Sequence, residues 1–365
     1  MKRIGNSFKG IIGGVVLILL GIVLLWWNEG NNVRNLKTTK EMDKSYVDVK
    51  SDSLNPNNEG KLVATYGKLI NEKELKDTVF EITVKTPVLK RIVEVYQWQE
   101  ESSTDEDGNT TYSYKKEWSS TLINSNDFHQ SGHDNPKIMP YENEVYTSDD
   151  VKVGAFTLSS NQVNMLSTKA NYTNFNKEET DKLNLNIINN YLISSKDYNN
   201  PQVGDYRISF VYNNSTDVSV LAVQSGETFV DFVSKAGKTV NRVMDGVHSG
   251  SEMINVIKKE NKIIKWVLRI GGILACVLGF ATIFKPLSAI TSYVPILGSI
   301  VGSAVGLISL VLGLCLSFVI IAIAWVRFRP VLGISLLVIA IALGVFLIMR
   351  GKKTEAPKTE TTTQK

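Results

Sequence analysis

The residues best suited to chemistry in this sequence are His129 and His133, which stand four positions apart beside Asp134. On a helix this spacing would present two imidazoles to one metal ion, as zinc sites require. The neighbouring Gly132 and the Asn135-Pro136 pair instead indicate a loop, and no third ligand is evident nearby. We therefore favour a structured turn over a metal centre at this position.

Other reactive groups are sparse along the chain. The acidic run Asp105-Glu106-Asp107-Gly108 lacks the twelve-residue ligand pattern with a closing glutamate that a calcium loop needs. Both cysteines, Cys276 and Cys315, fall in apolar stretches, and no phosphate loop, nucleophile elbow or Ser/His/Asp arrangement can be assembled. We expect a protein that is not an enzyme and that uses no metal or other cofactor.

Apolar residues are concentrated at the two ends of this 365-residue chain, and the charges follow the same division. Residues 31–262 are acidic, with 33 Asp and Glu against 27 Lys and Arg, whereas the two ends are basic. A polar, acidic region between basic apolar flanks is typical of a membrane protein and gives no support for nucleic-acid binding. The polar region contains no cysteine, so its own core must hold it together.

Four apolar segments are long enough to cross a membrane as helices. The four predicted spans are residues 10–27, 266–284, 297–326 and 331–349. The first is predicted to be a signal anchor, because no small-residue cleavage site follows it. The segments outside the spans are a short basic tail at 1–9, an interfacial connector at 285–296 and a basic disordered tail at 350–365.

The stretch Trp26-Trp27-Asn28-Glu29-Gly30 marks the predicted end of the first span. Indole rings favour the headgroup region, and Trp266 and Trp325 stand at comparable positions in later spans. Because Asn and Glu belong in water, we expect the chain to leave the membrane here. Residues 28–30 would then form a hinge into the polar domain.

Residues 28–250 are predicted to form a mainly β domain on the lumenal or extracytoplasmic side. Apolar and aromatic residues alternate in Val79–Val84 and in Thr111–Trp118, as in half-buried strands. A long hairpin with an acidic tip should join Val93–Trp98 to the second of these strands. From Ser251 the spacing becomes helical, so residues 251–265 should form an amphipathic linking helix that continues into the membrane.

The third predicted span contains Gly298, Gly302 and Gly306, which recur every four residues. On a helix they share one face, where the missing side chains let backbones approach closely. We expect this face to pack against another helix, either in the same chain or in a second copy. None of the spans holds an acidic residue at depth, which disfavours a transporter or pump.

A set of short motifs, each weak alone but specific in order and spacing, resembles the LUMA family, also called the transmembrane protein 43 family. The motifs are Asn28-Glu29-Gly30, Asn58-Glu59-Gly60 with Leu62-Val63, Val93-Glu94-Val95-Tyr96-Gln97-Trp98, Tyr112-Ser113-Tyr114 with Glu117-Trp118, Ile123-Asn124-Ser125 with Phe128, Gly132-His133 with Asn135-Pro136, Val203-Gly204-Asp205 with Arg207 and Ser209-Phe210, and Arg329-Pro330.

The resemblance implies an N-terminal anchor, a large lumenal or exterior domain and three closing spans. Animal members of that family sit in the endoplasmic reticulum and inner nuclear membrane, where they self-associate and act as scaffolds for envelope proteins. The family offers no catalytic residues to carry over. This chain differs in its very short N-terminal tail, so interactions that depend on a longer tail do not transfer to it.

The sequence therefore predicts an α+β membrane protein with four transmembrane helices and a β domain between the first and second. We expect a self-associating, non-enzymatic scaffold whose partners are the lipid bilayer, copies of itself and other membrane or envelope proteins. Its location would be the endoplasmic reticulum and inner nuclear membrane in a eukaryote, or the cytoplasmic membrane in a prokaryote. The alternative is a membrane sensor or lipid-binding module that uses an aromatic surface of Tyr96, Trp98, Tyr112 and Trp118; a membrane hydrolase using carboxylates ranks lowest.

Overall fold

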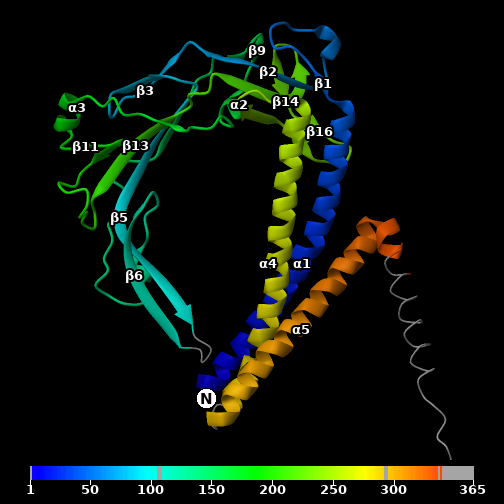
Figure 1. Cartoon of the computed structure of the whole chain (residues 1–365). Helices are drawn as coiled ribbons and strands as arrows, with labels where there is room; N and C mark the ends of the chain where they lie inside the picture. The colour runs from blue at the N-terminus through cyan, green and yellow to red at the C-terminus, as the bar shows by residue number, and fades with distance from the viewer. Residues whose placement is uncertain (1, 105–108, 292–294, 336–337, 339–365) are drawn as a thin grey trace, which may run out of the picture. The chain divides into compact units, whose positions relative to one another are not determined.

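The computed structural model describes residues 2–104, 109–291, 295–335 and 338, with side chains for 10–104, 109–286, 303–335 and 338 (Figure 1). The chain divides into two compact units. One consists of Met1–Lys37 and the chain from Lys258 onward, and the other is Thr38–Ile257. The first unit is helical and the second is rich in β-strands.

Three helices in the described part of the chain are long and apolar enough to span a membrane. They are α1 (Lys2–Ser45), α4 (Gly250–Thr291) and α5 (Pro295–Phe328). The fold class is thus confirmed for three apolar helices and a β-rich domain. The predicted fourth span, residues 331–349, lies largely outside the described residues, as does the predicted tail at 350–365.

Helix α1 does not end at the predicted membrane exit. It continues without a break through Trp27-Asn28-Glu29-Gly30 as far as Ser45, so the predicted hinge at residues 28–30 is wrong. Asn28 and Glu29 are almost completely buried and find polar partners on other helices. Because those contacts replace water, the polar residues have no reason to leave the helix. Helix α4 is likewise continuous and contains Pro286.

Glycines set the closest approach between α1 and α4. A Cβ on Gly14 would lie 2.6 Å from the Gly279 carbonyl oxygen, and one on Gly21 would lie 2.9 Å from the Gly272 carbonyl oxygen. The two pairs are spaced by seven residues on both helices, which corresponds to two turns. Only glycine allows backbones to pack this closely without displacement.

The glycine face predicted on the third span is a separate case. Gly306 has open space where a Cβ would be, whereas Gly313, further along α5, packs against the Val277 backbone. Gly298 and Gly302 lie where side-chain surroundings are not described. Packing of the Gly298, Gly302 and Gly306 face therefore stays a prediction.

Two seven-stranded sheets form most of the β unit. The first has the order β15 (Thr228–Val230), β14 (Asp217–Ser225), β2 (Leu62–Asn71), β8 (Val151–Val153) and β9 (Phe156–Thr157), with β1 (Val47–Asp48) beside β2 and β18 (Arg242–Asp245) beside β14. The second has the order β11 (Asn186–Ile188), β12 (Tyr191–Ile193), β13 (Tyr206–Tyr212), β5 (Val88–Thr104) and β6 (Thr110–Ser119), with β10 (Ala170–Asn171) beside β13 and β7 (Glu144–Thr147) beside β5.

Shorter elements complete the β unit. They are the hairpins β3 (Glu74–Asp77) with β4 (Ile82–Lys85) and β16 (Phe232–Val233) with β17 (Thr239–Val240), the helices α2 (Ser160–Val163) and α3 (Lys177–Lys182), and single turns of 3-10 helix at Pro56–Asn58 and Ser125–Asp127. Helix α2 begins with a capping box, in which the Ser159 and Gln162 side chains each bond to the other's backbone N–H.

Each sheet has its own apolar core, because alternate residues of its strands point to one side. Val63, Val153 and Val220 are fully buried in the first core, and Leu89 and Phe210 in the second. A third cluster joins the last turns of α1 and the first turns of α4 to the first sheet. Its buried residues are Met42, Leu62, Ala64, Leu221, Met253 and Ile254.

Candidate functional site

The β5–β6 hairpin carries many of the residues that the sequence singles out. Its register places Tyr96 opposite Trp118 and Glu100 opposite Tyr114, so their side chains share one face. The predicted hairpin is confirmed and extends further than expected, with strands reaching Thr104 and starting at Thr110. Figure 1 shows it extending well beyond the rest of its sheet. The predicted acidic tip, residues 105–108, lies outside the described residues.

A loop after β6 folds back and covers this aromatic face. The His133 ring stacks on Tyr114, with centroids 3.7 Å apart, and meets Trp98 edge-on at 4.7 Å. The His129 ring stacks on Tyr112 at 4.0 Å. Both histidines therefore pack against aromatic rings, and no group of three metal-ligating side chains occurs among the described residues. This arrangement agrees with the predicted structured turn.

The outer edge of β5 is closed at the same place. Trp98 donates its N–H to Asn135 Oδ1 at 2.7 Å, and Asn135 Nδ2 donates to the Trp98 carbonyl at 2.9 Å. Two residues earlier on β5, the Gly204 N–H donates to the Tyr96 carbonyl, and the Tyr96 N–H donates to the Asp205 carbonyl. Gly204 has a φ of +97°, which favours glycine. Side-chain amide and loop backbone thus replace a neighbouring strand.

An ion pair fixes the base of the hairpin. Arg207 on β13 donates to both carboxylate oxygens of Glu94, at 2.7 and 3.1 Å. The same guanidinium lies 4.7 Å from the Trp118 ring centroid and 4.5 Å from that of Tyr191. A bidentate pair between two aromatic rings holds a defined geometry. The motif residues Glu94, Tyr96, Trp98, Trp118, Gly132, His133, Gly204 and Asp205 are thereby brought to one region of the hairpin.

Polar contacts also link the hairpin to the covering loop. The Tyr114 hydroxyl donates to Glu100 Oε2 at 2.5 Å, and the His129 backbone N–H donates to the same oxygen at 2.6 Å. The hydrogen bond from Tyr114 is the main cause that lowers the pKa of Glu100. Burial, followed by the bond to Glu100, raises the pKa of Tyr114. Both groups therefore favour the state in which the carboxylate accepts and the phenol donates.

The loop after β6 also lines a pocket, and most of the side chains in that lining are uncharged. It is bounded by Leu122, Ile123, Asn124, Ser125, Asn126, Asp134, Asn135, Pro136 and Lys137. Asp134 and Lys137 are its two charged side chains, and the residues that line it include neither a histidine nor a second carboxylate.

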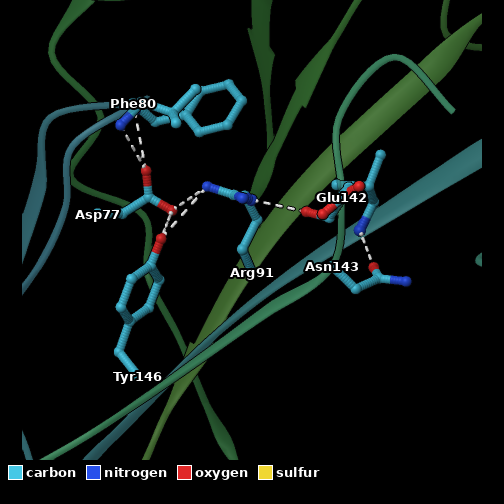
Figure 2. Close-up of polar contacts among 8 residues, drawn as sticks. Asp77, Phe80, Arg91, Glu142, Asn143 and Tyr146 are labelled. Atoms are coloured by element: carbon cyan, nitrogen blue, oxygen red, sulfur yellow. Dashed lines mark hydrogen bonds and ion pairs between the residues drawn. The ribbon is translucent and has the colours of Figure 1, made fainter.

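A second polar network lies inside the β unit (Figure 2). The Asp77 carboxylate is fully buried and accepts hydrogen bonds from the Val79 and Phe80 N–H groups, from Arg91 Nη1 at 2.5 Å and from the Tyr146 hydroxyl at 3.0 Å. Arg91 Nε donates in turn to the Glu142 carbonyl at 2.9 Å. Every side of the carboxylate is thus occupied by a donor, which suits a structural tie between β3, β5 and β7.

This network explains a wrong prediction. Alternation in Val79–Val84 predicts one strand, but the chain turns at residues 78–81 and β4 starts only at Ile82. Asp77 Oδ1 accepts both the Val79 and the Phe80 N–H, which stabilises the turn. Glu81 adopts a φ of +51° at its end. Phe80 and Ile82 are nevertheless both buried, so the apolar pattern marked core residues correctly.

A third polar cluster lies in the helical unit, where the sequence predicts that Glu29 faces water. That expectation is wrong. Glu29 Oε1 accepts from Arg269 Nε at 2.8 Å and also from Nη2, while Glu29 Oε2 accepts from Trp325 Nε1 at 2.9 Å. Asn28 Nδ2 donates to the Lys265 carbonyl at 3.0 Å. The cluster therefore ties α1, α4 and α5 together.

The remaining residues predicted near the membrane interface surround this cluster. A Cβ on Gly30 would lie 2.8 Å from Cζ of the Phe328 ring, so a larger residue at this position would require that ring to shift. The Phe328 ring also lies 5.4 Å from Trp26, and the Arg269 guanidinium lies 5.0 Å from Trp266. Trp27 is half exposed.

Sequence reasoning missed the pairing of Glu29 with Arg269. The available signal was one arginine in an apolar segment and one glutamate at the end of another.

Comparisons with known proteins identify similar chains. The model of a family described as Transmembrane protein 43 matches residues 95–330. Transmembrane protein 43 of Homo sapiens is 29% identical over 374 residues, which cover 96% of this chain and 92% of the human protein. The Mus musculus protein is 29% identical over 354 residues (90% and 87%), and the Drosophila melanogaster homolog 27% over 351 residues (89% and 90%). No solved structure matches the chain significantly.

Proposed function

The chain belongs to the Transmembrane protein 43 family, and we propose that it is a non-enzymatic membrane scaffold that self-associates and organises other membrane or envelope proteins. The β unit would lie on the lumenal or extracytoplasmic side and supply the contacts. In a eukaryote the protein would reside in the endoplasmic reticulum and inner nuclear membrane, and in a prokaryote in the cytoplasmic membrane.

The observation that carries self-association is the open edge of β6. This strand ends the order of its sheet, and β5 is its one strand partner among the residues that the structure describes. Trp98 bonds outward to Asn135, so its opposite residue Lys116 must also direct its N–H and carbonyl outward. A regular strand edge of this kind pairs readily with another strand.

Charge pattern selects a second copy of β6 as the partner. In an antiparallel pair centred on Lys116, Lys115 of each copy lies opposite Glu117 of the other. Opposite charges across strands favour that register, and Tyr114 would meet Trp118 on the aromatic face. This register also places the two Lys116 residues opposite each other, where like charges repel. Within each copy Lys116 Nζ lies 4.7 Å from the Trp98 ring centroid, so the ring holds each ammonium group on its own hairpin. Other registers lose the reciprocal Lys115–Glu117 pairing.

A symmetric disulfide tests this arrangement. Lys116→Cys places the two cysteines opposite each other, with Cα atoms about 5.5 Å apart, which a disulfide can bridge. In a chain with Cys276 and Cys315 replaced by alanine, mild oxidation of membranes should give a covalent dimer. Ser113→Cys is the matched control on the same strand and should stay monomeric. Equal dimer from both variants, or none from Lys116→Cys, contradicts the proposed pairing.

Charge exchange provides a second readout of the same contact. Glu117→Lys should weaken association, measured as dimer fraction in detergent, and Lys115→Glu combined with Glu117→Lys should restore it. Restoration is expected because both opposite-charge pairs reappear with their signs reversed. If the double variant stays as weak as the single one, the β6 interface is wrong.

Sidedness and envelope partners need separate experiments. Protease added to sealed vesicles should leave the β unit intact, and cleavage of that unit from the cytoplasmic side contradicts the proposed orientation. Crosslinked pull-down from native membranes should recover stable protein partners. Lipid or ligand binding by the aromatic face is less well supported, since His129 and His133 already stack on Tyr112 and Tyr114.

A further inference from the structure

The helical unit gathers basic side chains beside the buried Glu29. Lys262, Lys265 and Arg269 follow one another at spacings of three and four residues on α4, so they share one face of that helix, and Arg269 pairs with Glu29. Arg329 follows α5, and its backbone N–H donates to the carbonyl of Trp325, whose indole bonds to the same Glu29. Lys265 and Arg329 are half-buried, whereas Lys262 is exposed. Four cations therefore share one carboxylate at this position.

That carboxylate is already saturated. Glu29 is almost completely buried. Its Oε1 accepts a hydrogen bond from Arg269, and its Oε2 accepts one from Trp325. Among the described residues, neither Lys262, Lys265 nor Arg329 forms an ion pair with a carboxylate. A half-buried cation without a counter-ion loses solvation, and the Trp266 ring, 5.3 Å from Lys265 Nζ, returns only part of it. The site is thus short of negative charge.

The surroundings favour one source for that charge. Trp266 and Trp325 both lie within 6 Å of the Arg269 guanidinium, and indole rings favour the headgroup level of a bilayer. Exposed apolar side chains, including Ile270, Leu274 and Leu278, follow directly along α4. A phosphate at this level belongs to a lipid whose acyl chains lie against those apolar residues.

We propose that Lys265 and Arg329, aided by Lys262, form a binding site for the headgroup phosphate of an anionic phospholipid. The buried Glu29–Arg269–Trp325 cluster positions the three helices but does not contact the lipid. The site is independent of the proposed β6 contact, because all of its residues lie in the helical unit.

The test uses the full chain in detergent, titrated with phosphatidylglycerol or phosphatidylcholine and followed by native mass spectrometry. The wild type should prefer phosphatidylglycerol. Lys265→Gln with Arg329→Gln should reduce that preference about 30-fold. Each basic residue near a membrane surface raises the affinity for an anionic lipid about five- to six-fold, and the variant removes two of them. Lys61→Gln with Lys235→Gln removes the same charge from exposed sites in the β unit and should leave the preference unchanged.

Three outcomes overturn the proposal. The first is an unchanged lipid preference in the Lys265/Arg329 variant, and the second is an equal loss in the control variant. The third is that inorganic phosphate raises the thermal unfolding midpoint of the wild type as much as phosphatidylglycerol does, which would indicate a site for free anions. If the double variant does not fold, the exchange Lys265→Arg with Arg329→Lys keeps both charges and must retain the preference, whereas either single glutamine variant must lose part of it.

Discussion

Asp77 offers the sharpest test of how the β unit is held together. Asp77→Ala removes the acceptor of four hydrogen bonds and leaves Arg91 buried, with only 7% of its side chain exposed. Removing one partner of a buried ion pair typically costs about 3–5 kcal/mol, because the other charge stays desolvated. Water reaches no part of the Asp77 side chain and little of Arg91, so solvent screening reduces this cost only slightly. We expect a loss of about 4 kcal/mol in the free energy of unfolding.

Two further variants calibrate that value. Tyr146→Phe removes a single hydrogen bond to the same carboxylate and should cost about 1 kcal/mol. Asp149→Ala breaks the pair between Asp149 and Lys73, whose side chains are 79% and 53% exposed, and should leave the free energy of unfolding close to that of the wild type.

The assay is urea-dependent pulse proteolysis of the full chain in detergent, read as the amount of intact β unit. An Asp77→Ala variant within about 1 kcal/mol of the wild type would refute the argument that this buried pair is structural.

Three other perturbations follow from the same structure. Gly21→Leu should prevent the close contact of α1 with α4 and lower the thermal unfolding midpoint in detergent. Gly10→Leu is the control, because a side chain at that position meets open space and should leave the midpoint unchanged. Equal midpoints for the two variants would contradict packing through glycine. Glu29→Gln should lower the same midpoint, because Arg269 loses its counter-ion, and an unchanged midpoint would show that the ion pair does not stabilise the helices. Burial raises the pKa of Tyr206, so the folded chain keeps the phenol neutral at a higher pH than the unfolded chain does. Its contribution to the free energy of unfolding is therefore complete below about pH 10 and falls as the pH rises through the raised pKa. Thermal unfolding midpoints that stay constant from pH 9 to 12, measured at about one-unit intervals, would contradict this expectation.

Local patterns were sufficient for the β5–β6 hairpin. Tyr112, Tyr114 and Trp118 alternate with polar residues, and a period of two places them on one face whatever the rest of the fold does. The helical period that starts near Ser251 likewise appears in α4, because residues three and four apart meet on one side of a helix. Such periodicities are properties of the backbone alone.

Contacts between distant segments could not be predicted in the same way. Asn135 pairs with Trp98 across 37 positions, and His133 stacks on Tyr114, yet a lone Asn or His in a polar loop gives no sign of its partner. The Asp77 turn shows the same limit, since alternation continues through residues that a single buried carboxylate folds into a turn.

The sequence by itself determined that this is a membrane protein with a β-rich domain between apolar ends, because hydropathy and alternation act locally. The tertiary structure alone decided what happens at Asn28-Glu29-Gly30. A glutamate at the end of an apolar segment turns toward water when nothing else is near, but Arg269 and Trp325 approach from two other helices. Their donors replace water around Glu29, so α1 continues as a helix where the local sequence predicts an exit.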